Sequence, residues 1–336
     1  MSDELDLLRA ADPVRADAGP WRDRPLDARA EHALTRLLHS SRTQRARRRL
    51  VVRAEAAVLA LVAVLAFALS GAATKPAAAA PAPLAPRGDA PAVSLDTLAR
   101  RAEAHARTAG PQAGPRRGSH LQTWYLTMAT GPDAAPPVTV PEEHLTRWNP
   151  DGSGSELVVA TDPRHPGRPV IHDSGGRWST VNDGKILHRK TYPAGSDARH
   201  GGLPSRTKPP TDPAALRAHL ATLYGGADRQ TPQLLLALSS LLQEWTPGPR
   251  ETAAIVRMLA DADGLRPVGT VTDRLGRPGQ AYVYDAPDGP MDATRQMVIL
   301  DAATGRLLGS EVTFTKDLPE FRITSGEVLS YEAWMP

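Results

Sequence analysis

The feature that most constrains this chain is an uncharged run of 18 residues at positions 56–73, AAVLALVAVLAFALSGAA. As an α-helix rising 1.5 Å per residue, such a run spans about 27 Å, close to the thickness of the hydrocarbon core of a bilayer. No polar face interrupts it, so the run predicts a transmembrane helix over 54–73. A buried core helix and a cleaved signal peptide, ending near Ser70-Gly71-Ala72, are the two alternatives.

A block of arginines precedes this run and sets the expected orientation. Residues 1–53 contain 12 Arg against 8 Asp plus Glu, and no acidic residue lies between Glu31 and Glu55. Because positive charge beside a membrane span stays in the cytoplasm, the block predicts a single-pass plasma-membrane protein with a cytoplasmic N-terminus and an extracytoplasmic C-terminal part. The residues expected to set this topology, and to contact anionic lipid rather than nucleic acid, are Arg45, Arg47, Arg48, Arg49 and Arg53.

Composition divides the chain into four segments. Residues 1–53 hold too few apolar side chains for a core, so we expect a short, partly disordered cytoplasmic segment in which residues 1–40 could dock a regulatory partner. The transmembrane helix over 54–73 follows. Residues 74–93 are rich in Pro and Ala, which predicts an extended linker. Residues 94–336 then form one exported domain.

The order of predicted elements in 94–336 indicates an antiparallel α+β domain. Strand-like runs lie on both sides of a helical middle, which is typical of α+β folds rather than of a doubly wound parallel sheet. Ser94 is a helix cap, and Asp212-Pro213 and Thr231-Pro232 each place a proline at the start of a helix. The helices predicted in the middle cover 213–224, 232–245 and 248–262. The predicted strands cover 120–130, 144–149, 155–161, 176–181, 185–191, 268–273, 280–285, 295–301, 307–315 and 327–334.

Motifs for catalysis, cofactors and metals are missing from the sequence. The chain has no Cys, which excludes disulfides, thiol nucleophiles and Cys-ligated metals. None of the ten His residues pairs at the i, i+4 spacing of a helical metal site, and no glycine-rich phosphate loop occurs. His172, Asp173 and Ser174 bring three triad residue types together, but a triad needs spatial convergence, and we expect a loop there. The sequence therefore predicts no catalytic residue, no cofactor and no metal.

Five of the six tryptophans of the chain lie in the predicted exported domain, which has few Phe. The interpretation that we favour is that these side chains anchor the core, and the alternative is that one or two of them line a ligand cavity. The tryptophans concerned are Trp124, Trp148, Trp178, Trp245 and Trp334.

Several short motifs carry a resemblance to a known family. They are DELDLL at 3–8, WNPDG at 148–152, DPAAL at 212–216, DRLGR at 273–277, DAATGR at 301–306 and GEVLSY at 326–331. On these motifs and the Arg-rich block before the apolar run, the chain resembles a family of uncharacterised actinobacterial single-pass membrane proteins without an assigned activity. The resemblance covers nearly the whole chain, and it implies a topology and not a chemistry.

The exported domain also resembles the lipoprotein-carrier and sigma-regulator sensor folds, through its order of elements and the turn at 301–307. In those folds a curved antiparallel sheet wraps around helices. The resemblance implies a fold class of one transmembrane helix plus an α+β exported domain with a half-barrel-like sheet. It also implies a groove that holds an apolar ligand or an envelope protein, and we predict that Leu235 and Leu238 line it.

The function expected from these features is a membrane-anchored extracytoplasmic binding or sensing protein with a regulatory relay to its cytoplasmic segment. The chain lacks the His/Cys zinc-binding element of many anti-sigma domains, so direct binding of a sigma factor is not predicted. One alternative is a cell-envelope hydrolase, with His172, Asp173 or the acidic turns as the candidates. The other is a lipid or lipoprotein carrier without a signalling role.

Overall fold

The computed structural model describes residues 81–87, 91–110, 114–127, 137–162, 165, 167–174, 177–195, 207–224, 230–285 and 293–335. All of these belong to the second of two units into which the chain divides, Val62–Pro336. The predicted cytoplasmic segment 1–53, with its expected partner site at 1–40, and the predicted span 54–73 lie outside the described residues.

The described helices are short, and this corrects two predictions. They are α3 (Leu95–Thr108), α4 (Pro213–Tyr224), α5 (Thr231–Glu244) and α6 (Pro249–Ala260). The longest has 14 residues, or about 21 Å, against the roughly 30 Å of a bilayer core. No helix within the described ranges is long and apolar enough to cross a membrane. The fold class with a single transmembrane helix and the single-pass plasma-membrane location are thereby contradicted, and neither is carried further. The five topology arginines, Arg45, Arg47, Arg48, Arg49 and Arg53, lie outside the described residues.

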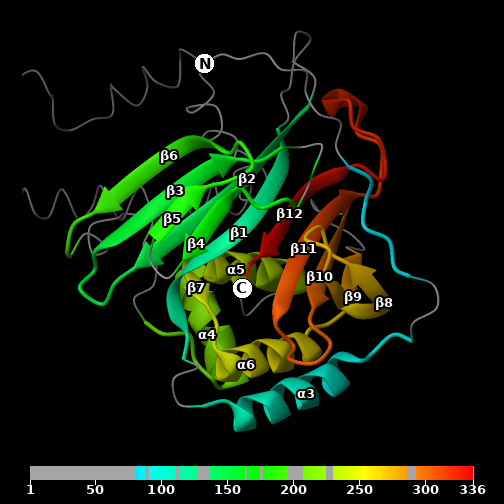
Figure 1. Ribbon diagram of the computed structural model, residues 1–336. Coiled ribbons are helices and arrows are strands. Elements are labelled where there is room, and N and C mark those ends of the chain that lie inside the picture. The colour runs from blue at the N-terminus through cyan, green and yellow to red at the C-terminus, as the bar shows by residue number, and fades with distance from the viewer. Residues whose placement is uncertain are drawn as a thin grey trace, which may run out of the picture. The chain divides into compact units, whose positions relative to one another are not determined.

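A ten-stranded antiparallel sheet dominates the fold (Figure 1). The strand order is β6-β3-β2-β1-β12-β11-β10-β9-β8, and β7 pairs with β1 beside this path. The strands are β1 (Arg116–Thr127), β2 (Val138–Trp148), β3 (Gly154–Ala160), β6 (Lys185–Tyr192), β7 (Trp245–Thr246), β8 (Arg266–Thr272), β9 (Pro278–Asp285), β10 (Thr294–Leu300), β11 (Leu307–Phe314) and β12 (Val328–Trp334). A separate hairpin consists of β4 (Ile171–Ser174) and β5 (Arg177–Thr180).

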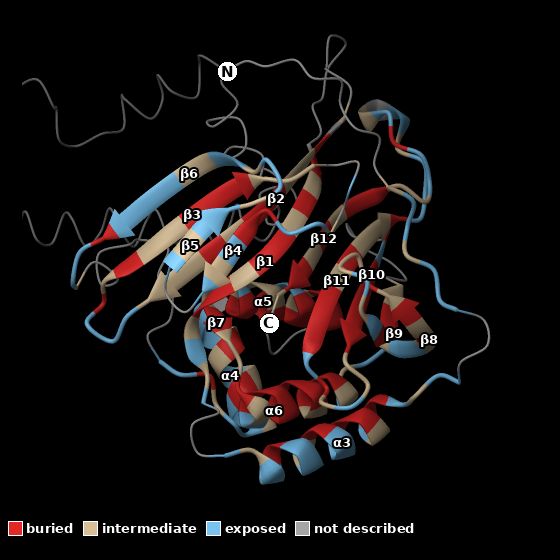
Figure 2. Cartoon of the chain, in the orientation of Figure 1, coloured by how far each residue is buried: buried red, intermediate tan, exposed pale blue. Residues whose placement is uncertain are grey.

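The main core lies between the helices and one face of the sheet. It unites buried residues of α3, α4, α5 and α6 with inward residues of β1, β9, β10, β11 and β12. Leu98, Leu220 and Leu259 from the helices and Tyr282 from β9 are fully buried there. Figure 2 shows these elements striped in red on the sides that face one another. Burial of apolar stripes on both layers therefore holds the helices against the sheet.

The three predicted central helices are confirmed to within two residues at each end. Asp212 accepts a hydrogen bond from the Ala215 N–H at 2.8 Å, as a cap before a proline should. Thr231, expected to cap the second central helix, is instead the first residue of α5, and Gln230 occupies the cap position. The Thr231 hydroxyl donates to the Asp263 carbonyl.

The prediction of a loop at positions 172–174 is wrong. These residues belong to β4, which pairs antiparallel with β5. Ile171 lies opposite Thr180 at one end of the pair, and Ser174 lies opposite Arg177 at the other. His172 and Asp173, at the centre of β4, give this segment no apolar pattern from which a strand could be predicted. The strand forms because β4 pairs with β5 in a hairpin. A short η2 turn at Pro319–Phe321 completes the described elements.

Residues 81–87, which the sequence places in a linker, pack on the sheet. The Leu84 N–H donates to the Glu311 carboxylate at 2.7 Å, and the Arg87 N–H donates to the Thr270 carbonyl on β8 at 2.8 Å. The Leu84 side chain covers an apolar cluster on the face opposite the helices. This stretch of the predicted linker thus contributes to the domain's packing.

The turn between β10 and β11 depends on Asp301. Its carboxylate accepts hydrogen bonds from the Ala303 N–H at 3.0 Å and from the N–H and hydroxyl of Thr304 at 2.7 and 2.8 Å. Burial raises the pKa of Asp301, but these hydrogen bonds and the charge of Arg306 outweigh burial and hold the pKa below its ordinary value. Gly305, with φ +73°, completes the turn.

Replacing Asp301 by Ala is expected to lower the free energy of unfolding by about 1–3 kcal/mol near neutral pH, because it removes the acceptor of these bonds. A carboxyl whose pKa is depressed by folding stabilises the protein above its unfolded pKa and loses this effect as pH falls through the folded pKa. Urea unfolding at about pH 7 and about pH 3 should therefore show a smaller difference between wild type and Asp301→Ala at the lower pH. An equal difference at both values would contradict this account.

Candidate functional site

Four strands on one side of the sheet, β1, β2, β3 and β6, form what we call the wing. The two faces of the wing differ in chemistry. On one face, Leu145, Leu157 and Val159 are buried beneath Val170 and Ile171, which lead into the β4–β5 hairpin. Because side chains alternate along a strand, the intervening residues lie on the face that α5 approaches.

That second face is polar, and we call it the polar face. Register pairs place its residues in rows across the strands, for instance Thr123 beside Glu142 and Val158 beside His188. The polar and aromatic residues of this face are Thr123, Glu142, His144, Thr146, Trp148, Glu156, Lys185, His188, Lys190 and Tyr192, and apolar Leu121, Val140, Val158 and Ala160 lie among them. Leu121 on this face joins the main core, but most of the neighbouring positions carry polar side chains rather than the apolar ones of a core-facing surface.

Hydrogen bonds link the polar face internally. His144 Nε2 lies 2.9 Å from Glu142, and the Tyr192 hydroxyl donates to Glu156 at 2.8 Å. Burial, followed by the hydrogen bond to Glu156 and its charge, raises the pKa of Tyr192 well above its ordinary value. Tyr192 is therefore a fixed hydroxyl donor at neutral pH.

Helix α5 closes the polar face on the side of β12. Ser239 and Gln243 on α5 donate to the Glu332 carboxylate at 2.5 and 2.6 Å, and the Ser119 hydroxyl donates to the Gln243 carbonyl. Burial raises the pKa of Glu332, and the hydrogen bonds from Ser239, Gln243 and Ser310 offset part of that rise. These polar contacts fix the helix to the sheet at this point.

A cavity of about 390 Å³ lies where the polar face ends, between the β2–β3 turn and β7. Its volume falls within the range of small-molecule sites, roughly 300–1,000 Å³. The lining residues are Pro115, Arg117, Trp148, Asn149, Pro150, Asp151, Gly152, Gly195, Lys208 and Trp245. Half-buried Trp148 and buried Trp245 supply its flat apolar surface.

Aromatic and cationic groups are layered at this cavity. The Trp148 ring stacks on the Tyr192 ring with centroids 5.0 Å apart and planes at 25°. The Arg117 guanidinium lies 5.3 Å from the Trp148 centroid, within cation–π range. The stacking fixes the plane of Trp148, so the indole is preorganised before any ligand binds.

The cavity carries a positive formal charge. Two cations, Arg117 and Lys208, against one carboxylate, Asp151, give a net charge of +1. Asp151 accepts hydrogen bonds from the Ser153 hydroxyl at 2.7 Å and the Ser153 N–H at 2.9 Å, and these bonds lower the pKa of Asp151. Its charge is thus directed into its own turn, while Lys208 is exposed at the cavity.

Hydrogen bonds within the β2–β3 turn position the residues at the edge of the cavity. The Asn149 N–H donates to the Ser153 carbonyl at 2.8 Å, and Gly152, with φ +76°, allows the chain to reverse between β2 and β3. The Gly195 N–H donates to the Asp151 carbonyl, which ties the segment after β6 to this turn.

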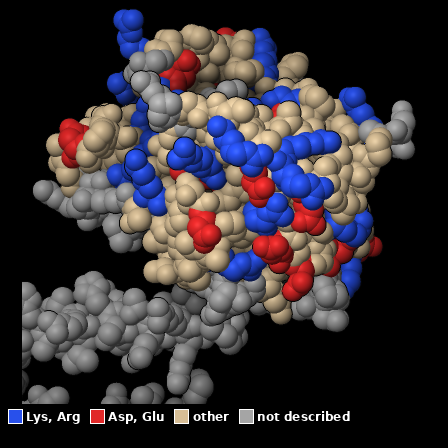
Figure 3. Space-filling model, turned by 90° about the horizontal axis from the view of Figure 1, so that it is seen from below, with Lys and Arg blue, Asp and Glu red and all other residues tan. Residues whose placement is uncertain are grey.

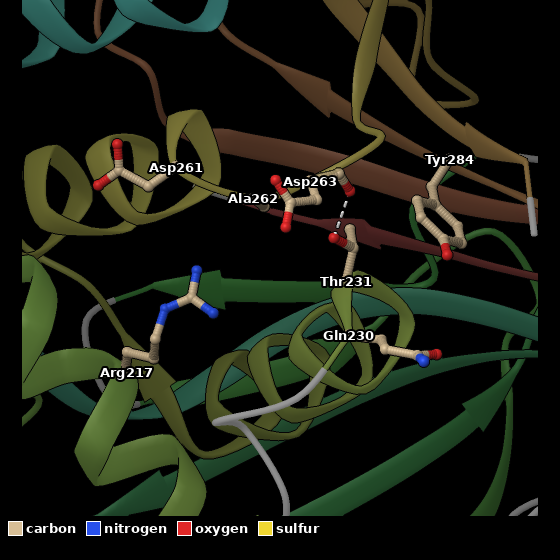
Figure 4. A pocket seen from close by; sticks show the side chains of 7 residues that line it. All are labelled: Arg217, Gln230, Thr231, Asp261, Ala262, Asp263 and Tyr284. Carbon is tan, nitrogen blue, oxygen red and sulfur yellow. Dashed lines mark hydrogen bonds between the residues drawn. The ribbon is translucent and has the colours of Figure 1, made fainter.

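A second cavity, of about 280 Å³, lies between α4, the start of α5, the end of α6 and β9. Figure 4 shows Arg217 and Tyr284 entering it from opposite sides, and the Thr231 hydroxyl bonded to the Asp263 carbonyl. Arg217 itself donates to the Met258 carbonyl. Tyr284 is the one aromatic residue among the described residues that line this second cavity, which therefore lacks the stacked aromatic wall of the first cavity.

The predicted site residues lie elsewhere. Leu235 and Leu238 are buried in the main core, and neither lines one of the two cavities described above. Asp173 forms an ion pair with Arg147, and the Ser174 hydroxyl donates to the Arg177 carbonyl, so these residues do not join His172 in a triad. Among the described residues, no group of three or more His, Asp or Glu could hold a metal ion.

The sequence analysis noted Trp148 and Trp245 as candidate cavity residues and WNPDG at 148–152 as a family motif, but it missed the cations of the cavity. Arg117 and Lys208 carry no motif, and they meet only because β1 and the segment before α4 converge at the end of the wing. Their positive charge does not distinguish Arg117 and Lys208 from the many other charged residues of the domain either. On the face in Figure 3, where α3 lies, acidic and basic side chains are intermixed, as in the pairs of Arg257 with Asp96 and Glu103.

Comparison with known proteins adds no assignment, since no protein-family model and no curated protein matches this chain.

Proposed function

We propose that the protein is a ligand-binding protein whose cavity between Trp148 and Trp245 takes a small anion that carries a flat ring. The observation that supports this proposal is the joint presence of two indoles and two cations around one cavity of about 390 Å³. The indoles supply apolar aromatic surface that a flat ring can contact, and Arg and Lys attract an acidic group. A binding role of this kind agrees with the expectation of a sensing or binding protein and requires no catalytic group.

Naphthalene-2-sulfonate is a suitable probe, because it combines a flat ring with a permanent negative charge. In calorimetric titrations of the full chain we expect saturable binding with one site. Lys208→Met should weaken binding about fivefold through the loss of one charge, and Trp148→Leu about tenfold through the loss of stacking. Lys316→Met removes an exposed lysine far from the cavity and should leave the affinity unchanged.

Two further titrations make the test decisive. The neutral analogue 2-naphthalenemethanol should bind more weakly than the sulfonate and should not respond to Lys208→Met. Dodecanoate tests the carrier alternative, in which an alkyl chain rather than a ring is held. Equal affinity for the charged and neutral naphthalenes, or equal effects of Lys208→Met and Lys316→Met, would refute the proposal.

A further inference from the structure

The two edge strands of the large sheet, β8 and β6, differ in what lies beside them. Strand β8 forms one edge, and there the Arg87 N–H donates to the Thr270 carbonyl, so the chain's own segment 81–87 occupies part of that edge. β8 also contains Pro267, whereas an irregular register occurs at both edges, between Pro267 and Gly269 in β8 and opposite Val158 and Val159 in β6. The proline and the covering segment are therefore what hinder the addition of another strand at β8.

Strand β6 forms the opposite edge. It pairs with β3 on one side, and within the described residues no strand pairs with its other side. An eight-residue strand is about 26 Å long and directs roughly every second N–H and C=O outward, so about four donors and four acceptors point away from β3. Figure 2 shows β6 largely in the colour of exposed residues.

The side chains of β6 select the kind of strand that could join it. Its sequence, KILHRKTY, holds three cations, Lys185, Arg189 and Lys190, and no acidic residue. Lys185 lies beside Ala160, and Lys190 lies beside Glu156, so both lysines project from the polar face. Ile186 pairs with Val159 on the other face and is 43% exposed. The polar face of this edge therefore carries the two lysines, while the other face carries exposed Ile186 together with Arg189, whose guanidinium lies 5.0 Å from the Trp178 ring.

We propose that the outer edge of β6 binds an extended acidic peptide of a partner protein as an added strand. The fitting peptide alternates acidic with apolar residues, because period-two alternation puts its acids beside the lysines and its apolar side chains beside Ile186. A second copy of this chain is a poor occupant, since two β6 strands would bring three cations against three. This site is separate from the cavity of the proposed function and does not depend on it.

The probe for this proposal is an acetylated and amidated octapeptide of alternating Glu and Val, titrated into the full chain at low ionic strength. We expect saturable binding that weakens with salt, as contacts between exposed charges do. In hydrogen-exchange measurements, the outward amides of β6 should exchange more slowly with the peptide present, whereas those of β8 should not change.

Three controls separate strand addition from charge attraction alone. An octapeptide of alternating Lys and Val should not bind. The Glu/Val peptide with every backbone nitrogen methylated keeps its charge but cannot donate to the edge in either direction, and it should lose at least about tenfold in affinity. The double variant Lys185→Glu/Lys190→Glu should lose about tenfold, against no more than about twofold for Lys316→Glu.

Because Lys185 and Lys190 are both exposed, the double variant is expected to fold. Circular dichroism of the variant verifies this before the titration. Absence of saturable binding by wild type, equal binding of the N-methylated peptide, or protection of amides outside β6 would each overturn the proposal.

Discussion

Replacing Glu143 by Ala should lower the free energy of unfolding by about 3–5 kcal/mol, the range for removing one partner of a buried charged cluster. Glu143 is fully buried, and its carboxylate contacts groups from two regions of the chain. His120 Nε2 lies 2.7 Å away, and the Gln122 side-chain amide donates at 2.9 Å. The N–H groups of Val170 and Ile171 donate at 2.8 and 3.1 Å.

The large effect follows from the unsatisfied groups that the substitution leaves behind. Two buried backbone N–H groups and two side chains lose their acceptor at once, and each such loss costs about 1–3 kcal/mol before relaxation. Glu143→Gln keeps the shape and one carbonyl oxygen, so it should be less destabilising than Glu143→Ala. The matched control is Glu103→Ala, which breaks a surface pair with Arg257 and should cost less than about 1 kcal/mol.

Urea unfolding followed by circular dichroism measures these differences. Hydrogen exchange adds a local readout, because the amides of Val170 and Ile171 should lose protection in Glu143→Ala. If Glu143→Ala and Glu103→Ala had similar effects, the buried carboxylate would not be what holds the β4–β5 hairpin to the wing.

Arg274→Met should destabilise the protein by a similar amount, again about 3–5 kcal/mol. Arg274 is 7% exposed and pairs at 2.5 Å with Glu311, which is 1% exposed. Its guanidinium lies 5.1 Å from the Trp124 ring and 5.4 Å from the Tyr331 ring, and these rings meet edge to face. The substitution keeps much of the apolar stem but leaves the Glu311 charge buried without its partner.

The double variant Arg274→Met/Glu311→Leu separates the pair from the packing around it. Replacing both members of a buried ion pair by apolar residues is often neutral or stabilising, so the double variant should regain most of the stability lost by Arg274→Met. A double variant as unstable as the sum of the two single variants would show no energetic coupling between Arg274 and Glu311, and would contradict this account.

The effect of Arg274→Met should also depend on pH. Burial raises the pKa of Glu311, and the nearby charge of Arg274 counteracts that rise, so the pKa of Glu311 should climb further when Arg274 is removed. A carboxyl whose pKa is raised by folding destabilises the protein increasingly as pH rises from the unfolded pKa through the folded pKa. The loss of stability in Arg274→Met should therefore be larger at about pH 7 than at about pH 5.

The elements that could be predicted from the sequence are those fixed by neighbouring residues. Ser94 caps α3 through the N–H of Thr97, and Asp212 caps α4 through the N–H of Ala215, so each helix start is encoded within four positions. The hairpin turn at 149–152 is equally local, because Gly152 alone supplies the positive φ.

The candidate site depends on convergence and could be predicted only in part. Trp148 and Trp245 meet because β7 pairs with the start of β1 while β2 pairs along its length, and no local pattern encodes that arrangement. Leu235 and Leu238 lie in the main core, and the groove that we expect them to line stays a prediction, because periodicity reveals burial but not whether the space opposite is filled. The buried acceptor role of Glu143 is likewise invisible until residues 170 and 171 are placed against it.

The neighbouring placement of β1 and β12 has a consequence for the order of events during synthesis. Thr123 on β1 donates to the Tyr331 carbonyl on β12, across a separation of 208 residues. At translation rates of about 5–20 residues per second, roughly 10–40 s pass between the emergence of these two strands from the ribosome. During that interval a nascent wing presents the open side of β1, a polar backbone edge that other nascent chains could occupy. The two halves of the sheet can be joined only afterwards, so a cell that makes this protein must keep the early half apart from its neighbours until the late half arrives.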